Sequence, residues 1–211
     1  REHMPRTAKA QRPDWGTARE ALLEAAAQEF AENGFRGASV SRIAKRTGVT
    51  QPLINHHFGS KDGLWRAVLD WTFADMEDAL AEAMDPALSN DEQLIEIVRQ
   101  IVHFFARKPE LARIVTTETN HPSEAFDYLF TKYLKPMLTL TQALLKKAKK
   151  EGNTDLDPRL VHFIVVGAAM QPFTEAEIAR RAFGMEPFSA KYTRAYADTL
   201  CEVLMRGIND D

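Results

Sequence analysis

The sequence has a single cysteine, Cys201, so no internal disulfide can form. This scarcity is typical of proteins that work in a reducing compartment. Cys201 falls on the apolar stripe of the last expected helix, and we interpret it as a buried structural thiol rather than a redox sensor. Long apolar runs are also missing. The longest, Val161 to Met170, is interrupted by His162 and is about half of a membrane span. No stretch resembles a signal peptide, so we expect a cytoplasmic protein.

Motifs of catalysis and metal binding are absent from the sequence as well. It has no phosphate-binding glycine loop, no nucleophile elbow and no Cys-x-x-Cys or His-Glu-x-x-His spacing. His103, His121 and His162 lie far apart along the chain. Glu118 and His121 are three residues apart and could share a helix face, where we interpret them as a surface pair. We therefore expect no enzymatic activity, no cofactor and no metal.

Charge is unevenly divided along the 211 residues, whose formal net charge is −3. Residues 1–66 hold 11 Lys and Arg against 7 Asp and Glu, a net of +4. Residues 67–211 hold 16 against 23, a net of −7. A basic N-terminal part on an acidic remainder is typical of a polyanion-binding head carried by a body with another task.

Hydrophobic periodicity predicts an all-α fold with nine to ten helices, because no window alternates as a strand would. Glycine and proline breaks place the helices at 17–33, 39–46, 50–56, 60–84, 91–106, 109–119, 123–150, 157–183 and 189–207. We divide the chain into a flexible basic tail (1–16), a helix-turn-helix head (17–65) and a helical-bundle body (66–211). Arg6, Lys9 and Arg12 of the tail could enter a DNA minor groove, or the tail could merely add positive charge.

Residues 39–57 have the features of two helices joined by a tight turn. Gly48 supplies the positive φ that a sharp turn needs. Thr50 can cap the second helix, and Pro52 is tolerated in a first helical turn because no intrahelical bond needs its N–H. The side chains expected to face inward are Val40, Ile43, Ala44, Val49, Phe58, and either Leu53 or Ile54. Gln51, Pro52, Asn55 and His56 are then left facing outward, and their amide and imidazole groups suit a DNA major groove.

This stretch resembles the DNA-binding signature of the tetracycline-repressor (TetR) family. The matching residues are Gly34-Phe35, Ser39-Val40, Ile43-Ala44, Gly48-Val49-Thr50 and His57-Phe58-Gly59-Ser60-Lys61-Asp62-Gly63-Leu64. The resemblance implies that Thr50, Gln51, Pro52, Asn55, His56 and Lys61 face DNA, and that Ser39, Ser41 and Arg42 reach its backbone. Lys61 could also be a plain surface lysine. Asn55 stands where the family commonly has an aromatic residue, so base preference cannot be borrowed from other members.

The last two long helices are expected to form a dimer interface, as the resemblance implies. The last helix carries an apolar stripe at i, i+3/i+4 spacing, and residues 160–170 are apolar nearly all round. The expected interface residues are Leu160, Phe163, Tyr192, Tyr196, Leu200, Val203 and Leu204. A core inside a monomer is the alternative. A two-fold dimer would present two recognition helices to a palindromic operator in double-stranded DNA.

A ligand cavity is expected between the central helices of the body. Its candidate lining residues are Phe104, Phe105, Thr116, Thr117, Phe126, Phe130, Tyr133, Met137, Met170, Gln171 and Phe173. Aromatic residues and methionines at helical spacing are also typical of plain core. Pro172 should kink its helix because it leaves the carbonyl of Ala168 without the usual donor. Such a carbonyl can border a cavity, and plain packing explains the proline equally well.

These features together predict a dimeric transcriptional regulator that responds to a small, mostly apolar effector. Repression is the expected output, although an activator would have the same sequence features. The alternative class is a helical module for protein interaction or small-molecule binding that has lost DNA binding. Binding of the ligand must favour the geometry that does not bind DNA, because only a difference in affinity shifts such an equilibrium.

Overall fold

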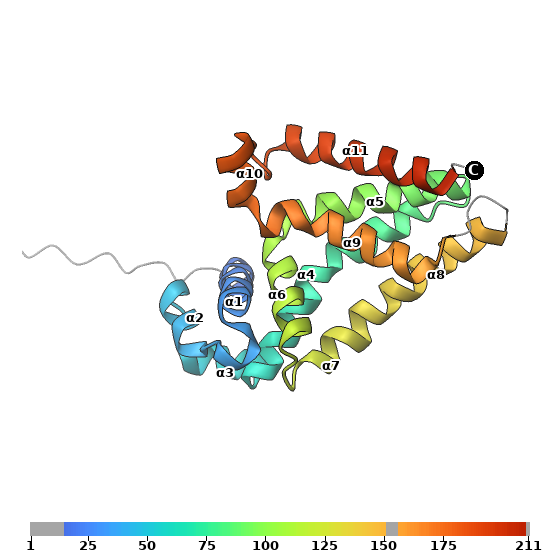
Figure 1. Ribbon diagram of the computed structural model, residues 1–211. Coiled ribbons are helices and arrows are strands. Elements are labelled where there is room, and N and C mark those ends of the chain that lie inside the picture. The colour runs from blue at the N-terminus through green and yellow to red at the C-terminus, as the bar shows by residue number, and fades with distance from the viewer. Residues whose placement is uncertain (1–14, 151–155, 210–211) are drawn as a thin grey trace, which may run out of the picture.

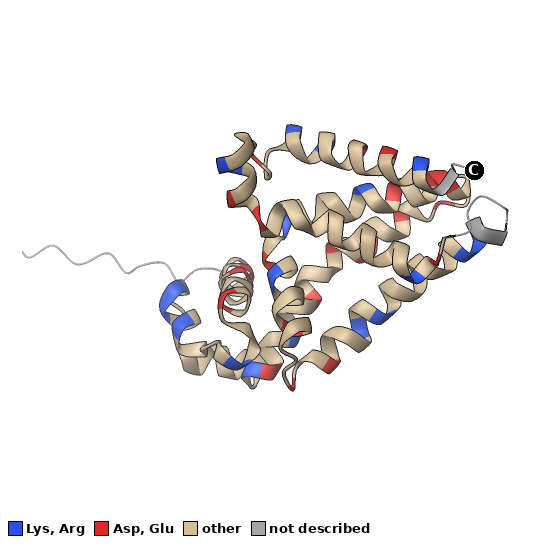
Figure 2. Cartoon of the chain, in the orientation of Figure 1, with Lys and Arg blue, Asp and Glu red and all other residues tan. Residues whose placement is uncertain are grey.

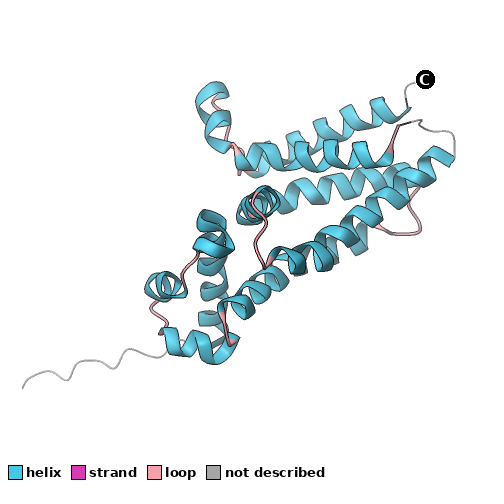
Figure 3. Cartoon of the chain, turned by 60° about the horizontal axis from the view of Figure 1, so that its bottom comes forward, coloured by secondary structure: helices cyan, strands magenta, loops and turns pink. Residues whose placement is uncertain are grey.

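The computed structural model describes residues 15–150 and 156–209, and its described residues form helices and no strands, as Figure 3 shows. The all-α prediction is confirmed. The N-terminal helices are α1 (Trp15–Gly37), α2 (Val40–Thr47), α3 (Gln51–Phe58) and α4 (Lys61–Ala83). They are followed by α5 (Asn90–Arg107), α6 (Pro109–Asn120), α7 (Phe126–Leu129), the π-helix η1 (Phe130–Leu134), α8 (Lys135–Lys150), α9 (Pro158–Thr174), α10 (Ala176–Phe183) and α11 (Ala190–Asn209).

The head consists of α1 to α3 and the start of α4, at one end of the molecule (Figure 1). Helix α4 runs from the head into the body, where α5, α9 and α11 lie across the far side from α2 and α3. One apolar core continues from Leu22 and Phe30 of α1, through Trp65 of α4, to Ile101 and Phe104 of α5. The indole N–H of Trp65 donates to the carbonyl of Ala125 at 3.3 Å, which ties α4 to the start of α7. Head and body therefore share a continuous interior.

Helix α1 contains a sharp break at Gly34, where φ is 64° and ψ is 174°. This conformation favours glycine, as expected from the Asn33-Gly34 signal. A side chain could not fit at this position without a shift, because its Cβ would lie 3.2 Å from Cγ2 of Thr117 on α6. The close approach of α6 to the end of α1 therefore depends on this glycine.

The segment predicted as one helix over 157–183 is two helices, with Glu175 between them. Pro172 lies two residues before the end of α9, so the missing N–H ends the helix rather than only bending it. The carbonyl of Ala168, which Pro172 leaves without its helical donor, accepts a hydrogen bond from the hydroxyl of Tyr196 on α11 at 2.7 Å. This hydrogen bond fits the alternative of plain packing, while Gly167 and Met170 on either side of Ala168 line a cavity of the body.

Two further boundaries differ from the prediction. Trp15 and Gly16 are helical, so the tail predicted to run to residue 16 ends before Trp15. The segment expected at 123–150 begins at Phe126 and contains the π-helical turn η1. In the part of the chain that the structure describes, no helix is both long and apolar enough to cross a membrane.

Candidate DNA-binding head and ligand cavity

Helices α2 and α3 meet at the tight turn predicted around Gly48, whose φ is 70°. Ile43 and Ile54 are buried at 0% and 1% exposure, while Leu53 is 39% exposed. Ile54 is therefore the anchor of α3, which settles the choice between these two neighbours. The side chains of Gln51, Pro52, Asn55 and His56 are all exposed, so α3 presents one polar surface away from the core.

The helix caps differ in part from the expectation. Thr50 occupies the N-cap position of α3 with an extended backbone, but its side chain makes no capping hydrogen bond. Ser39 does the same at α2. Pro52 lies in the first turn of α3, as expected. The hydroxyls of Ser39 and Thr50 are therefore not used by the helix ends that they precede.

A buried carboxylate, that of Glu29 on α1, holds α2 in place. Oε1 of Glu29 accepts from Nε of Arg42 at 2.7 Å and from the backbone N–H of Ser39 at 3.0 Å. Arg42 also donates from Nη2 to the carbonyl of Gly37 at 2.6 Å. Burial alone would raise the pKa of Glu29, but these hydrogen bonds and the charges of Arg42 and Arg46 outweigh it and lower the pKa. Arg42, expected to reach the DNA backbone, thus has much of its guanidinium bound within the head.

Lys61 is likewise bound within the protein. Its ammonium donates to the carbonyls of Arg36 and Ala38 at 3.2 and 3.3 Å, and lies 4.7 Å from the ring centre of Phe35. Ser60 supplies the cap of α4, where its hydroxyl accepts from the backbone N–H of Gly63. The structure therefore gives Lys61 a role in fastening α4 to the end of α1, beside any contact with phosphate.

Two residues of the head escaped the sequence reasoning. Lys45 of α2 is exposed, and no hydrogen bond or ion pair joins it to another described residue. Figure 2 shows the basic residues of α2 at the outer end of the head.

Trp15, assigned to the tail, stacks on His57 of α3 with ring centres 3.7 Å apart. Asp is a common N-cap residue, so Asp14 directly before Trp15 was a sequence signal for a helix that begins at Trp15. Ser41 is exposed on α2, whereas Arg6, Lys9 and Arg12 lie outside the described residues.

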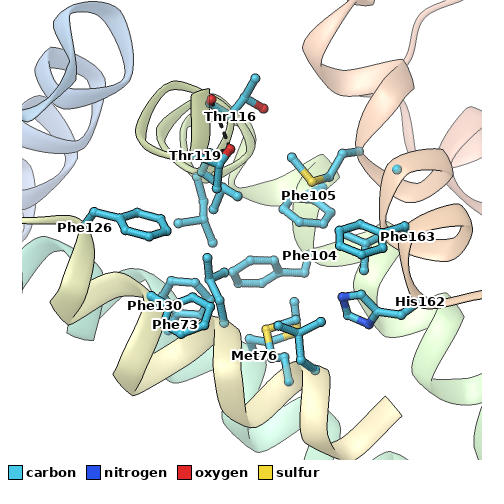
Figure 4. Close-up of a pocket in the computed structure, with 18 residues that line it drawn as sticks. Phe73, Met76, Phe104, Phe105, Thr116, Thr119, Phe126, Phe130, His162 and Phe163 are labelled. Carbon is cyan, nitrogen blue, oxygen red and sulfur yellow. Dashed lines mark hydrogen bonds between the residues drawn. The ribbon is translucent and has the colours of Figure 1, made fainter. Parts of the chain in front are cut away.

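The body contains a cavity of about 440 Å³ between α4, α5, α6, α9 and the run from α7 to α8 (Figure 4). Seven of the candidate residues line it: Phe104, Phe105, Thr116, Phe126, Phe130, Met137 and Met170. The other four lie elsewhere. Thr117 faces the end of α1, Tyr133 bonds Asp70, Phe173 is buried near Phe188, and Gln171 lines a separate groove beside α10. Helical spacing does not tell which apolar face of a helix borders a cavity, and η1 in addition shifts the register of Tyr133 after Phe130.

Sequence reasoning missed eleven residues of the lining. They are Phe73, Met76, Leu111, Val115, Thr119, Leu134, Leu138, His162, Phe163, Val166 and Gly167. None of the eighteen described lining residues carries a carboxylate or a lysine or arginine side chain. His162 is 7% exposed, and its Nδ1 lies 2.7 Å from the hydroxyl of Thr141. Burial lowers the pKa of His162, so its ring is neutral at neutral pH.

Head and body are joined by the carboxylate of Glu118 on α6, which is 2% exposed. Oε1 accepts from the backbone N–H of Phe35 at 3.0 Å, and Oε2 accepts from the hydroxyl of Ser123 at 2.6 Å. The interpretation of Glu118 as half of a surface pair with His121 is therefore wrong. Since Thr119 and Val115 on the same helix line the cavity, α6 connects the cavity to the end of α1.

The expected interface residues fall into three groups by exposure. Leu160, Phe163 and Val203 are 64%, 72% and 62% exposed, next to Ile164 at 60%. Leu200 is 8% exposed and packs in the chain's own core, which leaves its side chain little surface for a second copy. Tyr192, Tyr196 and Leu204 are half-buried. The exposed members of the expected interface therefore lie on α9, with Val203 on α11, while Ile178 and Phe183 form a second exposed apolar group on α10.

Comparison with known proteins adds to this geometry. Residues 22–68 match the model "Bacterial regulatory proteins, tetR family", and residues 90–208 match the C-terminal domain of the helix-turn-helix (HTH) dual regulator CecR. The "Probable HTH-type transcriptional regulator YttP" of Bacillus subtilis (strain 168) is 24% identical over 85% of this chain and 88% of its own. Several relatives named as repressors match over 49%, 36% and 31% of this chain.

Two solved structures share the whole fold. A TetR-like regulator from Rhodococcus sp. RHA1 is 26% identical, with a TM-score of 0.68 over 95% of this chain and 100% of its own. FadR from Bacillus subtilis, solved in complex with stearoyl-CoA, is 20% identical, with a TM-score of 0.66 over 90% of this chain and 99% of its own. At 20% identity the second likeness shows the fold alone.

Proposed function

The chain belongs to the TetR family of bacterial regulatory proteins, and we propose that it is a homodimeric repressor released from a palindromic operator by a small, mostly apolar effector. It would act in the cytoplasm, on double-stranded DNA. The observation that carries the proposal is the surface of α3, where Gln51, Asn55 and His56 are exposed together while Ile54 alone is buried. Side chains of this kind on a helix of this position read base edges in a major groove.

The apolar cavity supports a small-molecule effector. Its volume of about 440 Å³ falls in the usual range of ligand sites, and its lining is almost wholly apolar. FadR from Bacillus subtilis, which has the same fold, was solved in complex with stearoyl-CoA, which supports an acyl group as one candidate for the effector. Two elements offer a route to the head. Helix α4 carries Phe73 and Met76 of the lining and continues to Lys61, while α6 carries Thr119 and holds Phe35 through Glu118.

The proposal is tested by titrating the purified full-length protein against the DNA upstream of its own gene. We expect saturable binding that weakens with added salt, because phosphate contacts release counterions. Asn55→Ala should change which bases of the operator are preferred, at a cost of about 1–3 kcal/mol at the affected position. Glu110→Ala on α6, far from α3, is the control and should leave the base preference unchanged. Absence of binding to any fragment at moderate salt would refute the proposal.

A further inference from the structure

We propose that the effector carries a hydrogen-bond donor, such as a hydroxyl or amide N–H, and that Nε2 of His162 accepts it inside the cavity. The inference rests on the proposed role of the cavity as the effector site, and names the chemistry of the ligand's polar end. Figure 4 shows the His162 ring extending from α9 among the cavity residues, near Met76 and Phe104.

The hydrogen bonds of Thr141 favour one tautomer of His162. The Thr141 hydroxyl oxygen lies 3.0 Å from the carbonyl of Met137 and 2.7 Å from Nδ1 of His162. The hydroxyl either donates to Nδ1, or donates to a carbonyl and accepts from Nδ1. Only the second arrangement makes two hydrogen bonds, because the carbonyls of Met137 and Leu138, the latter at 3.2 Å, can only accept. We assign the second arrangement. The contact with His162 then needs its hydrogen from Nδ1. Because burial keeps the ring neutral, Nε2 is left with a lone pair and no hydrogen.

No described residue supplies a hydrogen-bond donor to Nε2 of His162. Since this residue belongs to the cavity lining, a ligand is the group placed to do so. An acceptor left unpaired against a bound apolar ligand is unfavourable, whereas a ligand donor at this point satisfies it. The histidine therefore discriminates between ligands by whether they present a hydrogen.

The other polar side chains of the lining, two threonines, also present hydrogen-bond acceptors to the cavity. The Thr116 hydroxyl donates to the carbonyl of Ala112 at 2.8 Å, and the Thr119 hydroxyl donates to that of Val115 at 2.7 Å. Both hydroxyls use their hydrogen within α6 and offer only lone pairs to the cavity. With no cation among the described lining residues, a carboxylate would meet lone pairs on every side. The cavity thus favours a neutral donor and disfavours an anion.

The inference is tested by calorimetric titration of the full-length protein with three probes of equal chain length: 1-decanol, decyl methyl ether and decanoate. At neutral pH, 1-decanol should bind roughly tenfold more tightly than the ether, and decanoate should bind most weakly. His162→Leu should remove the advantage of the alcohol over the ether while the ether keeps its affinity. Thr119→Val, which alters another polar group of the lining, is the matched control and should keep that advantage.

A second variant covers the case in which His162→Leu does not fold. Thr141→Val removes the group that favours the hydrogen on Nδ1, so the preference for the alcohol should shrink. Equal affinity for alcohol and ether, tightest binding of decanoate, or failure of 1-decanol to bind would overturn the inference. So would an unchanged preference in His162→Leu. If 1-decanol binds with the expected preference but operator affinity does not change, the cavity chemistry stands and the proposed effector control fails.

Discussion

Glu29 determines how α2 is held, and its carboxylate is buried at 0% exposure against Arg42. Replacing it with glutamine should lower the free energy of unfolding by about 1–3 kcal/mol, because charge-assisted hydrogen bonds are lost in a buried position. Chemical denaturation at neutral pH measures this loss. Glu32→Gln, which removes an exposed partner of Arg46, is the control and should change stability by no more than about 0.5 kcal/mol.

The stability of the protein should also depend on pH through Glu29. Its folded-state pKa is lowered from the ordinary 4.5, so its contribution is fully present above 4.5 and is lost as pH falls through the lower folded value. Denaturation midpoints measured from neutral pH downward should therefore decline less steeply in Glu29→Gln than in the unmodified protein. Identical acid profiles for the two would contradict the assignment.

Substitution of two lysines of the head should distinguish a residue that only contacts DNA from one that also stabilises the fold. Lys45→Ala should weaken binding to all operator sequences about equally and reduce the salt slope by about 1, without loss of stability, because Lys45 is exposed and has no described partner. Lys61→Ala should lower thermal stability as well, by about 1 kcal/mol, because two carbonyls lose their donor. Operator titrations over a range of salt, with parallel melting curves, measure both. A stability loss in Lys45→Ala would contradict this division.

At this scale the sequence predicts which side chains face inward but not what the polar ones bind. The spacing placed Ile43 in the core, since a helix buries one face whatever it packs against, but left Leu53 and Ile54 as alternatives of which the structure buries Ile54. The partner of Arg42 is Glu29, thirteen residues earlier, and the two meet only because α2 crosses α1. Such a pairing depends on the packing of helices, which periodicity does not encode.

At the scale of helices, Pro172 and Tyr196 form a compensating pair between α9 and α11. Tyr196→Phe should cost about 1–3 kcal/mol, because the carbonyl of Ala168 loses its donor in a half-buried place. In a Pro172→Ala background the restored N–H can bond that carbonyl, so the cost should fall by about 1 kcal/mol. Denaturant unfolding of the four proteins of this double-mutant cycle measures the difference. Tyr192→Phe is the control, and additive effects would contradict the pairing.

Glu118 should transmit ligand binding from α6 to the head. With Glu118→Gln, one side of the group becomes a donor, so the backbone N–H of Phe35 or that of Ser123 loses its acceptor. The ratio of operator dissociation constants with and without 1-decanol should then fall toward one. Glu124→Gln removes only an exposed ion pair with Arg36, and its ratio should stay that of the unmodified protein. An unchanged ratio in Glu118→Gln would exclude this route.

The helices themselves were largely predictable, because glycine and proline mark their ends and apolar spacing marks their faces. The exceptions have physical causes. The break at Glu175 follows from Pro172 so near the end of α9, where few helical bonds remain beyond it. The π-helical turn η1 has no proline or glycine in Phe130–Leu134. This turn points Tyr133 toward Asp70 and away from the cavity. A regular helical period does not predict that direction.

At the scale of the whole molecule, the exposed apolar residues of α9 predict a dimer that forms through this helix. Ile164→Glu should produce a monomer, because a charge would be buried between two copies, and Ile164 does not line the cavity. Operator affinity should fall by about 10²-fold or more as the two heads no longer bind together. Sedimentation velocity and operator titration measure both effects. Thr139→Glu on exposed α8 is the control, and a dimeric Ile164→Glu would place the interface elsewhere.

The stacking of Trp15 on His57 makes the head its own optical probe. Indole fluorescence responds to a stacked imidazole. His57 lies on α3, beside the residues proposed to contact bases, and Trp15 reaches it from the start of α1. Trp65 is buried against Phe30 and Phe35, and Trp71 lies under the ammonium of Lys108, so both report on the interior and the body instead. With Trp65 and Trp71 replaced by phenylalanine, emission from a single native residue would follow operator engagement in real time, without any attached dye.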